Sequence, residues 1–128
     1  MDNVSHGVLQ AATTIAKTTQ TIIGAEINCA HYDYITLFFQ YVNGDETGLI
    51  IQAHAMAETG GTAHQDVSWT AAAGTKTATA NSYTLTATAN RYIMLDVRGI
   101  EFVKFTQGGS ANDGTPTGTL AAQYTMLG

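Results

Sequence analysis

Two runs of alternating residues, at positions 33–42 and 49–57, constrain the fold more than any other feature of the sequence. The apolar residues that share one face are Ile35, Leu37, Phe39 and Tyr41 in the first run and Leu49, Ile51, Ala53 and Ala55 in the second. A period of two, filled with β-branched and aromatic residues, predicts β-strands. The residues between the runs include Asn43-Gly44, a turn signal. We therefore predict that the two strands pair as an antiparallel hairpin at the centre of a sheet.

The second face of this predicted hairpin is unusually apolar for a surface in contact with water. It carries Phe38, Val42, Ile50 and Met56 and few charges. Contiguous apolar surface of this kind marks a contact with another chain. We predict that these four residues form an oligomer interface and that the protein is a homo-oligomer, with a trimer as the expected state.

The rest of the chain predicts further short strands and no convincing helix. Strand-like runs occupy residues 21–23, 26–30, 65–70, 75–79, 83–87, 92–97, 101–106 and 119–127. The runs at 83–87 and 92–97 read as a second hairpin, and residues 107–118 read as a long loop that holds the single proline. About eight short strands at even spacing predict an all-β fold, a two-sheet antiparallel sandwich of jelly-roll or Greek-key type, in one domain over residues 21–128.

Residues 1–20 are predicted to form an extended N-terminal arm outside that sandwich. A short helix over residues 8–17 is the alternative, weakened by Thr13-Thr14 and by the lack of a wide apolar face. The arm has too few apolar residues to fold alone, yet more than a purely solvated tail would carry. The residues predicted to bind a capsid or another partner are Val4, Val8, Leu9 and Ile15.

Composition excludes several classes of partner. Only 12% of the 128 residues are charged, the net charge is −5, and the five basic residues are spread singly, so nothing predicts a nucleic-acid surface. No apolar run approaches the ~20 residues of a membrane span, and the N-terminus lacks the features of a signal peptide. We expect no membrane partner and synthesis in the host cytoplasm. The single cysteine, Cys29, is expected to be a small buried hydrophobe.

No residue pattern predicts catalysis, a metal or a cofactor. The four histidines, His6, His31, His54 and His64, include no His-x-His pair, and the nearest approach to a metal motif runs from His54 to Glu58. The carboxylates lie in turns or at strand ends, and no serine lies in a nucleophile elbow. We predict a protein that is not an enzyme.

Aromatic residues leave one ligand class open. Trp69, Tyr83 and Tyr92 could stack on sugar rings, although core and interface roles are more common for such residues. A carbohydrate-binding module therefore remains an alternative.

The order of these segments resembles a known group of proteins. Its elements are the first apolar strand, Asn-Gly-Asp-Glu-Thr-Gly, the second apolar strand, a Trp-containing strand, Tyr-Thr-Leu-Thr-Ala-Thr-Ala-Asn-Arg-Tyr-Ile and the closing Thr-Pro-Thr-Gly-Thr-Leu-Ala. Over roughly residues 20–127 this succession resembles small structural proteins of tailed-phage virions, in particular capsid decoration (cement) proteins. The resemblance implies a β-sandwich, often trimeric, that binds the capsid exterior and bridges major capsid subunits. A phage neck, tail or fibre component is the alternative within the virion.

Overall fold

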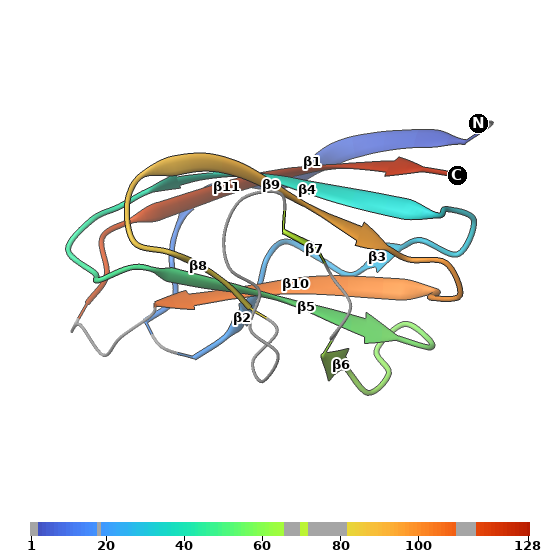
Figure 1. The fold of residues 1–128 in the computed structure, drawn as a ribbon. Coiled ribbons are helices and arrows are strands. Elements are labelled where there is room, and N and C mark those ends of the chain that lie inside the picture. The colour runs from blue at the N-terminus through green and yellow to red at the C-terminus, as the bar shows by residue number, and fades with distance from the viewer. Residues whose placement is uncertain (1–2, 18, 66–69, 72–81, 110–114) are drawn as a thin grey trace.

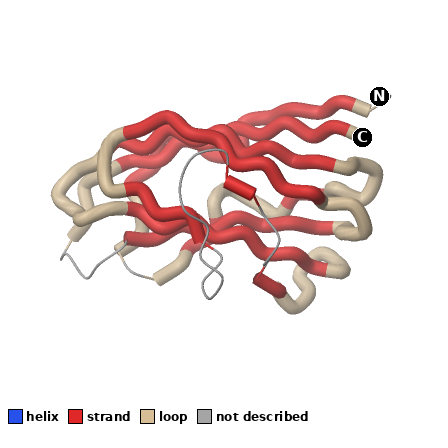
Figure 2. Tube along the Cα trace, in the orientation of Figure 1, coloured by secondary structure: helices blue, strands red, loops and turns tan. Residues whose placement is uncertain are grey.

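The computed structural model describes residues 3–17, 19–65, 70–71, 82–109 and 115–128. These residues form eleven β-strands in two sheets that pack face to face, and none of them lies in a helix (Figures 1 and 2). The predicted all-β, two-sheet antiparallel sandwich is confirmed. The described ranges accordingly hold no helix of the length and apolar character that crossing a membrane requires.

One sheet has five strands and the other has six. The five-stranded sheet has the order β1 (Val4–Thr14), β11 (Thr119–Leu127), β4 (Tyr34–Val42), β9 (Ala89–Asp96) and β7 (Thr70–Ala71). The six-stranded sheet contains β2 (Thr21–Ile22), β3 (Ile27–Asn28), β10 (Phe102–Gly109), β5 (Leu49–Met56), β6 (His64–Gln65) and β8 (Ser82–Leu85). In it, β2 and β3 both pair with β10, while β6 and β8 both pair with β5.

The strand order identifies the sandwich as a jelly roll. The principal strands of one sheet run β1-β11-β4-β9, and those of the other run β2/β3-β10-β5-β8, all antiparallel. The last strand therefore lies between the first and the fourth, and most connections cross from one sheet to the other. This interleaving is the double Greek key of a jelly roll. The predicted strand-like runs at 21–23 and 26–30 form two short strands, β2 and β3.

Both predicted hairpins are wrong. β4 pairs with β11 and β9, whereas β5 pairs with β10, β6 and β8 in the opposite sheet. The run at 83–87 likewise contributes β8 to the six-stranded sheet, while β9 lies in the other. A period of two reveals which face of a strand is buried, but two facing sheets bury alternate residues in the same way as two paired strands do.

The loop predicted at 107–118 is shorter than expected. β10 continues to Gly109, with Gln107 only 4% exposed, because residues 106–109 pair with β5 and residues 106–107 also pair with β2. The weak strand predicted at 75–79 lies outside the described residues, as does most of the run at 65–70.

Residues 4–14 also differ from the prediction of a separate arm. They form β1, which pairs with β11 from Val4↔Leu127 to Thr14↔Thr119 and is part of the five-stranded sheet (Figure 1). Ile15 follows in the core at 4% exposure, and its backbone N–H donates to the carbonyl of Gly118. The segment has few apolar residues because an edge strand needs to bury few side chains of its own.

The core lies between the two sheets. It is built from the inward-facing residues of the long strands, with Phe39 of β4 packed edge-to-face on Tyr83 of β8 at 5.6 Å between ring centroids. Cys29 is fully buried, as predicted. Its thiol donates toward the carbonyls of Ile100 and Glu101, and burial raises its pKa to about 11.

A buried carboxylate organises the crossing from β4 to β5. Glu46 is 5% exposed, and its side chain accepts hydrogen bonds from the backbone N–H groups of Gly44 (2.8 Å), Thr117 (3.1 Å) and Gly118 (2.8 Å) and from the Tyr41 hydroxyl. Burial alone would raise the pKa of Glu46, but these donors stabilise the anion and lower the pKa to about 2. The carboxylate thus ties the 43–48 crossing to the segment that enters β11.

Phe39 and its neighbour Phe38 provide a matched test of the core. Phe39 is 1% exposed and Phe38 is 42% exposed on the opposite face of β4. We expect Phe39→Ala to lower the free energy of unfolding by about 3–5 kcal/mol, through lost burial and the cavity left behind. Phe38→Ala should cost less than about 1 kcal/mol, as surface substitutions usually do. Urea unfolding at low protein concentration measures both, and equal losses would contradict the assignment of faces.

Glu46→Gln tests the crossing through its acid dependence. Because the folded-state pKa of about 2 lies below the ordinary 4.5, the Glu46 anion stabilises the fold above about pH 4.5, and this contribution disappears as the pH falls toward 2. We expect Glu46→Gln to cost about 3 kcal/mol at pH 7 and much less at pH 2–3. Urea unfolding of both proteins across this range measures the difference. A constant difference at all pH values would show that the charge is not what stabilises the crossing.

Candidate assembly surface

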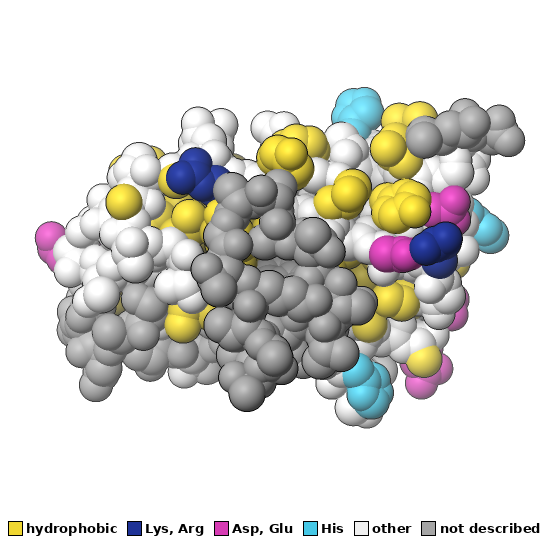
Figure 3. Space-filling view, in the orientation of Figure 1, with side chains coloured by type: hydrophobic (Ala, Val, Ile, Leu, Met, Phe, Trp, Pro, Cys, Tyr) yellow, Lys and Arg dark blue, Asp and Glu magenta, His cyan; other side chains and the backbone are white. Residues whose placement is uncertain are grey.

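The outer face of the five-stranded sheet carries most of the exposed large apolar side chains of the described chain. We define this outer face by Val4 (65% exposed), Val8 (69%), Phe38 (42%), Val42 (55%), Tyr92 (50%) and Met94 (46%). Figure 3 shows hydrophobic side chains gathered over the part of this sheet that contains β4 and β9. In β4 and β9 they alternate with core residues, so burial of one face of the sheet places them on the other; in β1 they alternate with the small residues Ser5 and Gly7.

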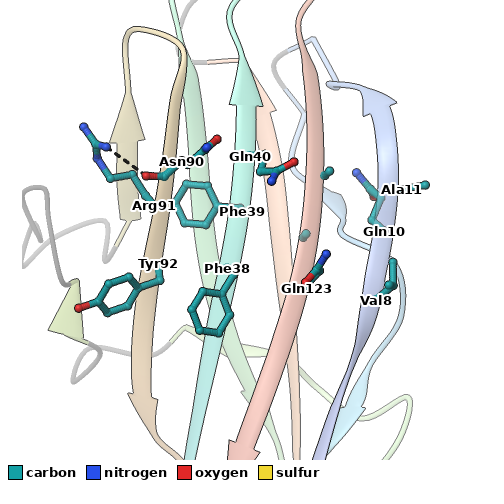
Figure 4. A pocket seen from close by; sticks show the side chains of 12 residues that line it. Val8, Gln10, Ala11, Phe38, Phe39, Gln40, Asn90, Arg91, Tyr92 and Gln123 are labelled. Carbon is teal, nitrogen blue, oxygen red and sulfur yellow. Dashed lines mark hydrogen bonds between the residues drawn. The ribbon is translucent and has the colours of Figure 1, made fainter.

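Strand register brings Val8, Phe38 and Tyr92 into one row, together with Gln123. Val8 of β1 lies opposite Gln123 of β11, Gln123 lies opposite Phe38 of β4, and Phe38 lies opposite Tyr92 of β9. The two aromatic rings are neighbours, with centroids 5.9 Å apart and planes tilted by 40° (Figure 4). Four residues that are far apart in sequence therefore form a continuous band across four strands.

A shallow groove of about 480 Å³ runs beside this row. Its lining includes Ala121, which lies opposite Gln40, and Gln40 in turn lies opposite Asn90. Figure 4 shows Gln40 and Asn90 on their neighbouring strands. Within the described part of the chain, the side-chain amides of Gln40, Asn90 and Gln123 make no hydrogen bond, so they are available to a ligand or a partner.

Charge is scarce on the outer face. The outward positions of β4, β9 and β11 include one carboxylate, Asp96, at the end of β9. Hydrogen bonds from the side chain and backbone of Arg98 lower the pKa of Asp96 to about 2, and the Arg98 guanidinium also lies 5.7 Å from the centroid of the Tyr34 ring. The opposite charges of Asp96 and Arg98 cancel, so the outer face presents apolar and amide groups and little net charge.

The four residues predicted as an oligomer interface do not form one surface. Phe38 and Val42 lie on the outer face, but Ile50 is half-buried and Met56 is 2% exposed in the other sheet. The prediction placed them together because it paired β4 with β5. Tyr92 and Met94, which do share the face, were missed, although their alternation with Ile93 and Leu95 was visible in the sequence.

The four residues predicted as partner contacts of the arm also separate. Val4 and Val8 belong to the outer face. Leu9 packs partly buried against the core, and Ile15 is buried within it. Two of the four are thus available to a partner, and they extend the same surface as Phe38.

The four histidines do not gather into one site, and of the three candidate sugar-binding aromatics only Tyr92 is exposed on the described surface. His54 is half-buried, with Nε2 3.2 Å from the Thr106 hydroxyl, and burial followed by the charge of Lys104 lowers its pKa. Among the described residues, no three His, Cys, Asp or Glu side chains are grouped as metal ligands. Tyr83 is 2% exposed and cannot stack on a sugar, whereas Trp69 lies outside the described residues.

Comparison with known proteins supports the fold. No protein-family model and no curated protein matches the chain. It is similar to a structure from Bacillus endospore appendages, which form a family of disulfide-linked pili, with a TM-score of 0.56, 14% identity, and coverage of 98% of this chain and 89% of that one. It is also similar to a structure of infectious bursal disease virus, Gx strain, with a TM-score of 0.53, 12% identity, and coverage of 98% of this chain but only 32% of that one. At these identities the likeness shows a shared β-sandwich fold.

Proposed function

We propose that this protein is a non-enzymatic structural subunit that assembles through the outer face of its five-stranded sheet. The observation that carries the proposal is the row from Val8 through Phe38 to Tyr92, extended by Met94 and Val42. A face that gathers this many large exposed apolar side chains, interrupted only by uncharged polar groups such as Gln123, is typical of a contact with another protein. Contact with another protein would remove it from water, at roughly 25 cal/mol for each Å² of apolar surface covered.

Within this role we favour a virion protein on the capsid surface, a decoration protein that binds and bridges major capsid subunits. The resemblance in sequence to decoration proteins supports it, and so does a jelly roll similar to structures from a virus and from a pilus, which are both built from assembled subunits. A broad, nearly neutral sheet face suits attachment to a lattice of other proteins. A neck, tail or fibre subunit would use the same surface.

The assembly we propose is non-covalent. The similar appendage structure belongs to disulfide-linked pili, but the only cysteine of this chain, Cys29, is fully buried in the core. Self-association into a trimer stays the prediction made from the sequence, now with Phe38, Val42, Tyr92 and Met94 as its contact residues.

A carbohydrate-binding module is the second candidate, and one observation favours it. The paired rings of Phe38 and Tyr92 lie beside three side-chain amides that make no hydrogen bond in the described structure, those of Gln40, Asn90 and Gln123. Aromatic faces and amides are groups that bind neutral sugars. In this case the protein would be a monomer in solution and its outer face would bind a glycan.

Phe38→Lys tests assembly through the outer face. The substitution places a charge in the middle of the row, and burying an unpaired charge is costly. We expect light scattering coupled to size exclusion to give a multiple of the 13.5 kDa chain mass for the wild type at micromolar concentration. Phe38→Lys should give a smaller species.

Ile22→Lys is the matched control, since Ile22 is 37% exposed on the six-stranded sheet and should tolerate the change with no loss of mass. A wild-type protein with the mass of one chain would contradict self-association through the outer face, and glycan binding would then be favoured if the particle test below also fails. An equal effect of both lysines would remove the outer face from the mechanism.

Association with virions can be tested on purified particles. We expect mass spectrometry of particles from the producing culture to detect the chain, and mild denaturant to release it before the major capsid protein. Re-added wild-type protein should rebind the stripped particles and raise their melting temperature, while Phe38→Lys should not. Absence from the particles would contradict the virion role without affecting the assembly surface.

A further inference from the structure

The free edge of β1 is a second surface that can bind another chain. β1 ends the five-stranded sheet and pairs with β11 on one side only, and among the described residues no strand pairs with its other side (Figure 1). An unpaired edge presents a row of N–H and C=O groups that can accept a further strand. Residues 4–8 of this edge keep one unbroken register with β11.

The alternation of hydrogen bonds between β1 and β11 shows which backbone groups of β1 point toward the free edge. The N–H of Asn3 donates to the carbonyl of Gly128 (3.3 Å), and the N–H of Gly128 donates to the carbonyl of Asn3 (2.9 Å), so these two residues form a hydrogen-bonded pair. Such pairs alternate with non-hydrogen-bonded pairs along an antiparallel ladder. Ser5 and Gly7 therefore bond to β11, while the N–H and C=O groups of Val4, His6 and Val8 face the free edge.

The sequence of this segment is self-complementary. It reads Val4-Ser5-His6-Gly7-Val8, so a two-fold axis at His6 would place Val4 opposite Val8, Ser5 opposite Gly7, and His6 opposite its own copy. The outward side chains would then match valine to valine. On the opposite face of the strand the opposed residues are Ser5 and Gly7, which are both small. Small residues suit this face because a Cβ on Gly7 would lie only 3.0 Å from the Tyr124 hydroxyl.

The rest of β1 is unsuited to the same pairing. Its register with β11 shifts between Val8 and Gln10 and again between Gln10 and Thr13. Such irregularities twist an edge strand and block the addition of another strand. The regular part of the edge is thus confined to the segment whose sequence matches itself in the antiparallel direction.

We propose that β1 pairs antiparallel with β1 of a second copy of this chain about a two-fold axis at His6. The two five-stranded sheets then form one continuous sheet, and Val4 and Val8, both more than 60% exposed in the single chain, pack against their counterparts. The contact rests on the proposed assembly role, but it is made by the backbone edge of β1. Of the outer-face residues it includes only Val4 and Val8, whereas Phe38, Val42, Tyr92 and Met94 take no part in it. The two contacts can therefore fail separately.

Cysteine cross-linking tests whether the two-fold axis lies at His6. Directly opposed residues of a hydrogen-bonded antiparallel pair have Cα atoms about 5.5 Å apart, within the range that a disulfide spans. We expect His6→Cys to form a covalent dimer under mild oxidation. Thr13→Cys, also exposed on β1, is the control and should not cross-link, because the two copies of residue 13 would lie roughly 45 Å apart along the strands. The wild type should stay uncross-linked because Cys29 is buried.

The register is tested by mixing two variants. Val4→Cys and Val8→Cys should cross-link with each other when mixed. Each variant alone should cross-link much less, because its two copies of the same residue would lie about 13 Å apart along the strands. Repeating the mixture in the Phe38→Lys background removes the outer-face contact and should leave the cross-link intact.

Three results would overturn the proposal, provided that circular dichroism shows folded variants. They are no cross-link for either His6→Cys or the mixed pair, equal cross-linking of Thr13→Cys, and self-cross-linking of Val4→Cys as fast as the mixture. Any of these, together with a wild-type mass above one chain that Phe38→Lys reduces, would reject the edge contact and leave the outer-face assembly standing.

Discussion

The buried carboxylate of Glu46 fixes the point at which the chain crosses from one sheet to the other, and much of the jelly roll depends on that crossing. It accepts hydrogen bonds from backbone N–H groups of two segments that are 70 or more residues apart in sequence. One segment contains Gly44, and the other contains Thr117 and Gly118. No side chain fits where these segments meet, since a Cβ on Gly118 would lie 2.2 Å from the Glu46 carboxylate. This arrangement lets β4 and β5 face each other across the core, and it leaves the opposite face of β4 free for other contacts.

The sequence predicted the strands better than their partners. Alternation identified the inward residues of β4, from Ile35 to Tyr41, because these depend only on local periodicity, and the apolar character of a single thiol predicted the burial of Cys29. It could not distinguish a hairpin from a crossing, because Asn43-Gly44 is also a turn signal in a loop whose conformation is set by Glu46 and by the distant Gly118. Nor could it show that residues 4–14 belong to the sheet, because their backbone partners are at the other end of the chain.

The same limit explains why only part of the predicted interface lies on one surface. Phe38 and Val42 could be predicted to face away from the core, since they are out of phase with its residues. Their true neighbours, Tyr92 on one side and Gln123 and Val8 on the other, come from strands that only the fold brings into register. The outer face is therefore a product of topology, and it links the N-terminal segment to the predicted interface in a way that neither segment shows alone.

A protein that assembles through a sheet face needs that face to be rigid before contact, and here the Glu46 crossing and the dense core provide the rigidity. Hydroxyl-radical footprinting of the assembled protein tests this account most directly, because Phe38, Tyr92 and Met94 are both exposed and reactive in the single chain. The account predicts that oxidation of these three side chains falls severalfold in the assembly relative to dilute protein, while the modification of Ile22 stays unchanged. Equal oxidation of Phe38, Tyr92 and Met94 in the two states would contradict it.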